Sequence, residues 1–243
     1  TIFFSSFIMS ITPGKMGELL KSILIKEVNG EPLSKTMPIV FAERLTDFLS
    51  MAFLAIVGAF VFNYGQSIII AMGVLFILLV IILSNKKICF AILNWIKKIK
   101  FLSKYADKFI TAYESIYTLL KFKTLISTFI ISAFAWFFEC LAFYFVLRIF
   151  DASGSAEVSV LTATFIYCFS TLVGAIAMLP GGLGATEASL TGLLIFLNIS
   201  KDISAASTII IRICTLWFAV LLGIIATFIY ERITKIKPLE IIE

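Results

Sequence analysis

Histidine is absent from the 243-residue sequence, and charged residues make up only 14% of it. The missing histidine removes the commonest metal ligand and the commonest general base at neutral pH. Four cysteines are present, but they are widely spaced, form no CxxC pair and are interpreted as buried thiols. We therefore expect no metal, no cofactor and no enzymatic activity.

Apolar residues, in contrast, are abundant. They form 60% of the chain, whose mean hydropathy is +1.07, whereas soluble domains are about 45 to 50% apolar. Runs long enough to cross a hydrocarbon core as helices cover residues 38–62, 66–84, 124–149, 158–178 and 203–230. A shorter run, 183–197, begins with glycines and fits either a re-entrant helix or a thin span. The sequence predicts an all-α, polytopic transmembrane helical bundle.

The chain opens at Thr1 with an apolar stretch, residues 2–11, that is too short to span a membrane. We interpret it as the end of a helix that begins earlier, so the sequence is expected to be N-terminally truncated. Residues 1–243 are otherwise predicted to be a single transmembrane domain.

Basic residues predict the orientation of the domain. Lysines crowd residues 86–123, whereas only Arg148 and Lys201 fall in loops on the opposite side. By the positive-inside rule, the lysine-rich segments are cytoplasmic and lie beside the anionic inner leaflet of the cell membrane. The net charge of +5 is then no sign of nucleic-acid binding. Within 86–123, apolar residues from Leu102 to Leu120 recur at helical spacing and predict a basic amphipathic helix, lying either on the headgroups or against neighbouring helices.

Two Pro-Gly breaks interrupt the apolar pattern and resemble each other. One opens at Pro13 and Gly14 and the other at Pro180 and Gly181, and each continues with a further glycine and a glutamate. An arginine follows 31 positions after Pro13 and 32 positions after Pro180. Because the helices that carry these arginines are predicted to run in opposite directions, the two units form inverted repeats, as in many secondary transporters.

Paired breaks of this kind place half-helix ends near the membrane interior. Free N–H groups and the positive end of the helix dipole can hold an anion there. The alternative is that the prolines only kink helices and the glycines only permit close packing.

Ionisable side chains inside a span are costly and therefore functional candidates. Arg212 lies about 14 Å into its span at 1.5 Å per residue, and Glu139 lies about as deep from the other side. Arg212 has no acid within a turn on its own helix, so its partner is either Glu187 or Glu139. For Glu139, the alternative is a carboxyl that stays protonated or bonds to a helix backbone.

A second charge cluster lies nearer the cytoplasmic end of its span. Glu43, Arg44 and Asp47 are three or four positions apart and share one helical face. An arginine between two carboxylates keeps donors for a phosphate, which it binds as a bidentate fork. A structural ion pair between helices is the alternative.

Five blocks of sequence, taken in order, resemble the signatures of the lysylphosphatidylglycerol synthase transmembrane region family. They are PGKMGELLK at 13–21, PLS at 32–34, ERLTD at 43–47, LPGGLGATE at 179–187 and RICTLW at 212–217. The resemblance covers essentially the whole chain. It implies a flippase-like membrane domain, which in the multiple peptide resistance factors moves aminoacylated phosphatidylglycerol to the outer leaflet after a separate domain attaches the amino acid.

The residues and the resemblance together predict a lipid translocase that moves a phospholipid or lipid-linked headgroup. The alternatives are a membrane scaffold for a separate synthase or glycosyltransferase and a lipid-modifying intramembrane enzyme. The expected partners are membrane phospholipids, such a synthase or glycosyltransferase, and a second copy of the chain. The predicted headgroup site comprises Pro13, Gly14, Gly17, Glu18, Glu43, Arg44, Asp47, Glu139, Pro180, Gly181, Gly182, Gly184, Glu187 and Arg212.

Overall fold

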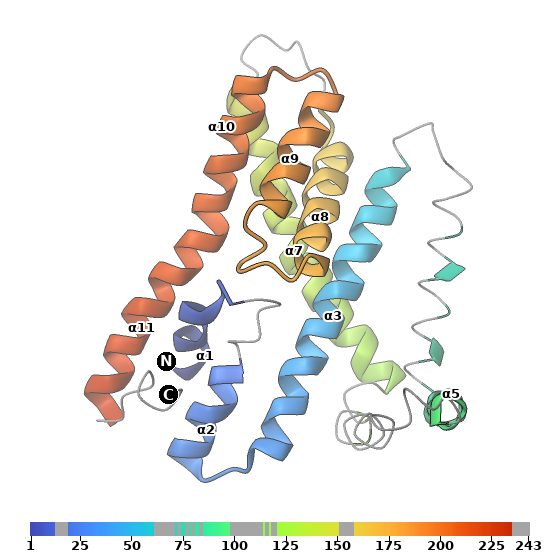
Figure 1. The fold of residues 1–243 in the computed structure, drawn as a ribbon, viewed down its shortest axis with the longest axis vertical. Helices are drawn as coiled ribbons and strands as arrows, with labels where there is room; N and C mark the ends of the chain where they lie inside the picture. Colours follow the sequence, from blue (N-terminus) through green and yellow to red (C-terminus); the bar gives the residue numbers. More distant parts are fainter. Residues whose placement is uncertain are drawn as a thin grey trace.

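The computed structural model describes residues 1–12, 19–60, 85–97, 121–150 and 158–234, with single residues at 71, 74, 75, 78, 81, 82, 114 and 117. These residues form helices joined by turns (Figure 1). The helices are α1 (Ile2–Ser5), η1 (Ser6–Met9), α2 (Leu20–Asn29), α3 (Leu33–Ala59), α5 (Lys86–Lys97), α7 (Phe122–Phe150), α8 (Val160–Ile176), α9 (Ala185–Phe196), α10 (Lys201–Arg212), η3 (Ile213–Trp217) and α11 (Phe218–Thr234). The predicted all-α class is confirmed.

Two of the described helices are long and apolar enough to cross a membrane: α7 and the continuous helix α10–η3–α11. Only 17% and 22% of their most apolar windows are buried inside the protein. The core helix of a soluble protein would be mostly buried, whereas α7 exposes large side chains such as Ile131, at 70%, and Phe138, at 64%. These apolar surfaces require lipid around them.

Helices are confirmed at four of the five predicted long runs, with ends that move by a few residues. α3 begins five residues before the predicted position 38, since Leu33 follows the extended Pro32 directly. The run at 66–84 lies largely outside the described residues. The shorter run at 183–197 forms α9, whose 12 residues reach only about 18 Å at 1.5 Å per residue.

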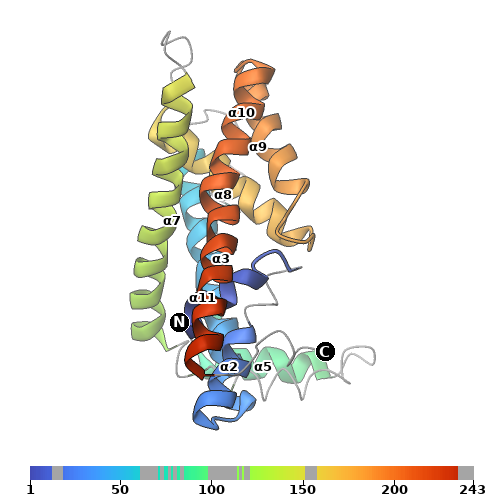
Figure 2. The ribbon, with the colours of Figure 1, turned by 90° about the vertical axis from the view of Figure 1, so that its left-hand side faces the viewer.

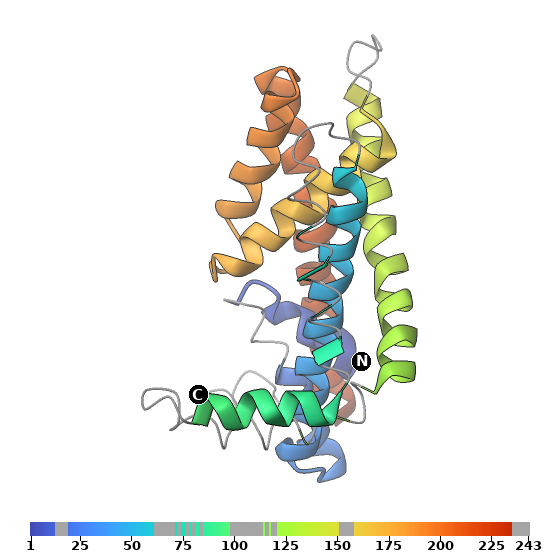
Figure 3. The same ribbon diagram turned by 90° about the vertical axis from the view of Figure 1, so that its right-hand side faces the viewer.

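The described part of the basic segment forms α5, which lies across the long axis of the bundle at one end (Figures 2 and 3). Lys86 lies over the rings of Phe90 and Tyr117, with Nζ 5.4 Å from each centroid. The amphipathic helix predicted between Leu102 and Leu120 falls almost entirely outside the described residues. Arg148 belongs to the last turn of α7, and that end of α7 lies at the opposite end of the bundle from α5 (Figure 1).

The cysteine prediction is correct for three thiols and wrong for the fourth. Cys89, Cys140 and Cys168 are buried, whereas Cys214 is exposed. Cys214 lies in η3, whose neighbouring Ile213 also faces outward at 54% exposure. Apolar runs around a membrane helix therefore do not by themselves mark the face that is buried in protein.

α8 and α9 form a helical hairpin. The start of α8 and the end of α9 lie at the same end of the bundle as the start of α10 (Figure 1). Its tip, residues 177–184, reaches only halfway down the α10–η3–α11 helix, which is also seen from the side in Figure 3. At the other end, the segment α1–η1 and the helix α2 lie side by side, and the described chain is interrupted between Thr12 and Leu19.

Each hairpin packs on the long helix that follows the other hairpin. η1 contacts α11 at Gly223, where an added Cβ would lie 2.1 Å from the amide nitrogen of Ile8. α8 contacts α3 at Gly58, where an added Cβ would lie 2.7 Å from both the Leu161 oxygen and the Phe165 nitrogen. The two glycines permit backbone contact between the crossed halves.

Candidate functional site

Arg212, the last residue of α10, is the centre of a polar cluster halfway along the bundle. Its Nε donates to Glu187 Oε1 at 2.5 Å, and a terminal nitrogen donates to the carbonyl of Gly181 at 2.7 Å. The Arg212 and Glu187 side chains are only 13% and 27% exposed. Of the two partners predicted for Arg212, the structure shows Glu187.

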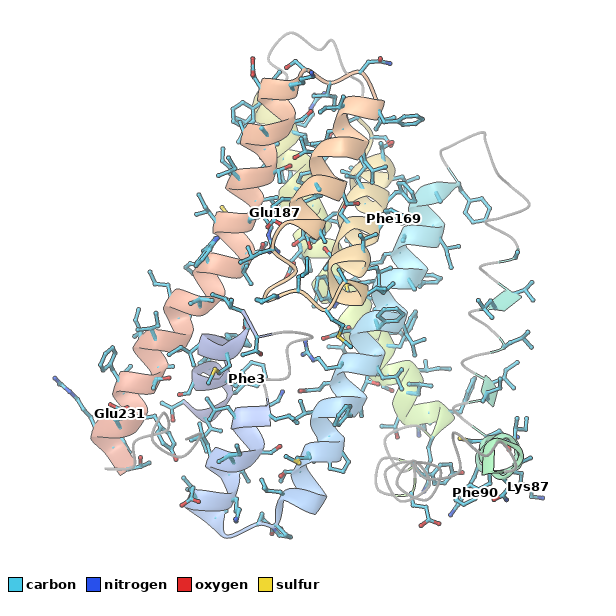
Figure 4. The ribbon with its side chains drawn as sticks, viewed as in Figure 1. Phe3, Lys87, Phe90, Phe169, Glu187 and Glu231 are labelled. Carbon is cyan, nitrogen blue, oxygen red and sulfur yellow. The ribbon has the colours of Figure 1, made fainter. Side chains whose placement is uncertain are left out.

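Glu187 links this guanidinium to the start of α9. It is the third residue of the helix, and its Oε2 accepts from the N–H of Gly184 at 2.6 Å. A glutamate at this position satisfies an N–H at the helix start and lies favourably on the helix dipole. Figure 4 places Glu187 at the α9 end nearest the tip, facing α10. One carboxylate therefore accepts both from a guanidinium nitrogen and from an N–H at a helix N-terminus.

The tip itself is built from the second Pro-Gly break. Gly181, Gly182 and Gly184 adopt positive φ angles of 60°, 66° and 85°. A Cβ on Gly182 would also lie 2.7 Å from the Thr186 hydroxyl oxygen. Both the backbone conformation and the close approach favour glycine, and the resulting turn aims the Gly181 carbonyl at Arg212. Pro180 begins this turn, and its carbonyl accepts from the N–H of Leu183 at 3.0 Å.

At Gly181, the tip of the second hairpin approaches the described end of the segment that follows η1. A Cβ built on Gly181 would lie 3.5 Å from the Ile11 Cα and 3.3 Å from a methyl group of Leu216. Ile11 directly precedes the first Pro-Gly break. Four predicted site residues of that break, Pro13, Gly14, Gly17 and Glu18, lie outside the described residues.

The first half of the chain carries an ion pair at a corresponding place. Lys21, the second residue of α2, donates to Glu43 of α3. Arg44 pairs with Asp47 at 3.1 Å, and Asp47 also accepts from Ser132 of α7 at 2.6 Å. Of the two carboxylates predicted around Arg44, the structure shows Asp47 paired with it and Glu43 paired with Lys21.

Glu139 lies on another helix pair. Its Oε2 accepts from the hydroxyl of Tyr167 in α8 at 2.6 Å. The bond ties α7 to the hairpin that carries the tip. The predicted site residues that the structure describes thus fall into three groups, one at Arg212, one at Arg44 and one at Glu139.

Sequence reasoning missed three partners in these groups: Lys21, Ser132 and Tyr167. Tyr167 had a usable signal, because its hydroxyl lies in the middle of the apolar run 158–178 and needs a hydrogen-bond partner there. Lys21 is the last residue of the block at 13–21, in which nothing indicates that a lysine pairs with Glu43, and Ser132 is a common residue in membrane helices. Neither carried a signal that distinguished it.

A sequence model described as lysylphosphatidylglycerol synthase TM region matches residues 1–223. The chain belongs to this family. Its helical membrane domain is thus established, and the family resemblance of the five sequence blocks is confirmed.

Relatives of this family member have been found in archaea. The chain is 30% identical to the UPF0104 membrane protein MJ1078 of Methanocaldococcus jannaschii, over 93% of this chain and 95% of that protein. It is 26% identical to the UPF0104 membrane protein PH1989 of Pyrococcus horikoshii, over 91% of this chain and 73% of that protein. No solved structure matches the chain. These names identify membrane proteins and indicate no catalytic activity.

Proposed function

We propose that this membrane protein is a lipid translocase that carries a phospholipid or lipid-linked headgroup across the cytoplasmic membrane. The observation that supports it best is the Arg212 cluster, since an arginine and a helix N-terminus converge halfway along the bundle. An arginine fork and helix N–H groups are the two common ways in which proteins hold phosphate. The basic end that carries α5 would be cytoplasmic.

The proposed path lies between two inverted repeats. α1–η1–α2–α3 and α8–α9–α10–α11 each consist of a hairpin followed by a long helix, and the long helices run in opposite directions (Figure 1). The second hairpin would be re-entrant, because its tip, residues 177–184, stops halfway along the bundle (Figure 1), and by the repeat the first hairpin would be re-entrant too. Transporters with such repeats expose a central site to alternate sides by rocking one part against the other.

In this mechanism, Glu187 holds the place of a phosphate. Its two oxygens occupy the Arg212 guanidinium and the Gly184 N–H, which are the groups that a phosphodiester would use. An arriving headgroup phosphate displaces the carboxylate, and a cationic part of the headgroup is then met by the released Glu187. The acyl chains stay in lipid along apolar surfaces such as exposed Phe138.

A membrane scaffold is the second candidate. The observation that favours it is α5, a basic helix that lies across the end of the bundle with Lys86 and Lys87 exposed (Figures 2 and 4). Such a surface fits either anionic lipid or a separate synthase or glycosyltransferase. A scaffold would tolerate substitutions in the Arg212 cluster and would be impaired by loss of these lysines.

The test is transbilayer movement of fluorescent phospholipids in liposomes that contain the full-length protein. Arg212→Ala should abolish movement, and Arg212→Lys should restore only part of it because a lysine lacks the bidentate fork. Arg232→Ala, at the exposed end of α11, is the matched control. Unchanged movement in Arg212→Ala would remove this cluster from the mechanism. Mass spectrometry of the lipids distinguishes a translocase, which leaves headgroup masses unchanged, from an enzyme.

A further inference from the structure

The helices α5 and α7 begin close together at one end of the bundle. Cys89, the fourth residue of α5, and Leu125, the fourth residue of α7, are buried in one small apolar cluster together with Leu49 of α3. Exposed lysines lie in or directly before the first turns of these two helices. Four of them form the lysine surface: Lys86, Lys87, Lys121 and Lys123.

The described contacts do not explain why lysines occupy these positions. A cation in the first turn of a helix is opposed by the positive end of the helix dipole, and neither helix has an acidic residue there to compensate. Among the residues that the structure describes, no carboxylate pairs with any member of the lysine surface. Lys86 lies over the rings of Phe90 and Tyr117, which attract its charge but do not neutralise it. The lysine surface therefore has a positive charge that an anion from outside the protein can compensate.

The position of the lysine surface in the fold indicates where that anion comes from. α5 lies across the long axis of the bundle, whereas α7 runs along it (Figures 2 and 3). Since α7 is long and apolar enough to cross a membrane, α5 then lies parallel to the membrane surface. Residues 86–123 contain nine lysines and only two acidic residues, so anionic headgroups are the complementary partner.

The N–H groups at the start of α5 are already engaged. Those of Lys87 and Ile88 donate to the side chain of Asn85 at 3.0 and 3.3 Å. The junction therefore offers an anion its lysine side chains, whose long apolar stems can follow the hydrocarbon while the ammonium groups stay at the headgroups.

An apolar row on α7 begins within the lysine surface. Phe122 lies between Lys121 and Lys123, and every fourth residue after it is a large apolar side chain; the exposed fractions in this row range from 38% to 64%. The row consists of Phe122, Ile126, Ile130, Phe134 and Phe138.

Residues four positions apart form one ridge on the surface of a helix. This ridge extends about 24 Å at 1.5 Å per residue, whereas half of a hydrocarbon core is about 15 Å thick. A lipid chain can therefore lie against the row over the whole depth of its leaflet.

We infer that the lysine surface and this row together bind a phospholipid of net negative charge from the leaflet at the basic end of the bundle. Its phosphate lies among the ammonium groups, and one hydrocarbon chain lies along the row. The site is separate from the Arg212 cluster halfway along the bundle, and it does not depend on the proposed translocation. A zwitterionic phospholipid brings its own cation to the lysines and is held less tightly. A protein partner would use the lysines but not the row, which continues into the hydrocarbon core.

The test measures how strongly the full-length protein retains lipids in phosphatidylcholine vesicles. A trace of phosphatidylglycerol or phosphatidylcholine with a spin label on its chain is added, and electron paramagnetic resonance gives the immobilised fraction of each lipid. Phosphatidylglycerol should be immobilised more strongly, and salt should reduce the difference because exposed charges are screened. Inorganic phosphate should displace it no more than chloride of the same ionic strength does, because phosphate has no chain to lie on the row.

Charge variants identify the side chains responsible for this preference. The main variant combines Lys86→Gln, Lys87→Gln, Lys121→Gln and Lys123→Gln. Its preference for phosphatidylglycerol should fall about fivefold, because each lysine near anionic lipid contributes to binding. Replacement of the same four lysines by arginine should keep the preference and guards against a folding defect. Lys201→Gln, at the exposed start of α10 on the opposite end of the bundle (Figure 1), is the matched control and should also keep it.

Photolabelling locates the lipid chain. Phosphatidylglycerol with a diazirine near the end of one chain should label α7 around Ile130 and Phe134, about 12 to 18 Å from Phe122 at 1.5 Å per residue. The four-glutamine variant should lose this label.

Equal immobilisation of the two lipids by the wild type would overturn the inference, as would displacement by phosphate beyond that by chloride. An unchanged preference in the four-glutamine variant would also overturn it, and would leave the lysine surface to a separate synthase or glycosyltransferase. None of these measurements follows movement across the bilayer, so a failure of the translocase proposal would not alter their outcome.

Discussion

The two hairpin units of the bundle share one plan, and each has a described ion pair that joins its short helix to its long helix. In the first unit the cation, Lys21, is on the short helix α2 and the carboxylate, Glu43, on the long helix α3. In the second unit the carboxylate, Glu187, is on the short helix α9 and the cation, Arg212, on the long helix α10. The cation and the carboxylate thus lie on opposite helices in the two pairs, and the arginine of the first unit that matches Arg212 by its distance from the proline is Arg44, next to Glu43.

In both units, however, the cation is the more buried partner. Lys21 and Arg212 are 10% and 13% exposed, whereas Glu43 and Glu187 are 41% and 27% exposed. A buried cation beside a more accessible carboxylate suits a site where an incoming anion replaces the carboxylate. Under the proposed function, the second unit would carry more of the binding, because Glu187, unlike Glu43 in the described hydrogen bonds, also accepts from an N–H at a helix start.

The largest expected effect concerns the crossing of the two units. Gly223→Leu should leave little folded protein, because even its Cβ would lie 2.1 Å from a backbone nitrogen of η1. Gly58→Leu, with its nearest contacts at 2.7 Å, should lower the free energy of unfolding by about 3 kcal/mol, the upper end for overpacking. Thermal unfolding in detergent measures both. Gly192→Ala is the control, since nothing lies within 4 Å of its added Cβ, and equal stability of all three variants would contradict the crossed packing.

The next effect compares the two ion pairs. Arg212→Ala should destabilise the protein by about 3 kcal/mol, since it leaves the carboxylate of Glu187 partly buried without its cation. Lys21→Ala should cost under about 1 kcal/mol, because Glu43 is largely accessible to solvent. Chemical denaturation of the two variants under one condition gives the difference. A greater loss for Lys21→Ala would reverse the assignment of the main site to the second unit.

A third prediction tests whether Glu187 competes with phosphate. Glu187→Gln should bind a short-chain phospholipid about tenfold more tightly, which corresponds to about 1.4 kcal/mol of removed competition. Glu43→Gln should change this affinity much less. Calorimetric titration of the detergent-solubilised protein compares the two variants, and weaker binding by Glu187→Gln would mean that the carboxylate assists the headgroup instead of holding its place.

The smallest effect concerns the hydrogen bond that joins α3, in the first unit, to α7. Ser132→Ala removes the hydrogen bond to Asp47 and should lower the free energy of unfolding by about 1 kcal/mol. Ser127→Ala, whose hydroxyl only donates to the Lys123 carbonyl within α7, should be nearly neutral and serves as the control. A loss of equal size in both variants would show that the tie to α3 contributes nothing specific.

Much of the fold could be predicted because its signals are local. Apolar runs marked α3, α7, α8 and the α10–η3–α11 helix, and the Pro-Gly break at Pro180 marked the tip of the second hairpin. The cost of a charge in hydrocarbon singled out Arg212 and Glu139 before any contact was known. Each of these inferences needs only the sequence of one stretch of chain and the properties of the hydrocarbon around it.

The partners, in contrast, were decided by packing between distant segments. The sequence by itself left Arg212 a choice between Glu187 and Glu139, and only the turn at Gly181 and Gly184 brought Glu187 to it. Each hairpin packs on the long helix of the other half. This packing likewise depends on Gly58 and Gly223, which contact backbone that is distant in the sequence. Hydropathy and spacing determine which helices form and where they break. Which faces meet depends on the shapes of all the helices together, and only the tertiary structure contains that information.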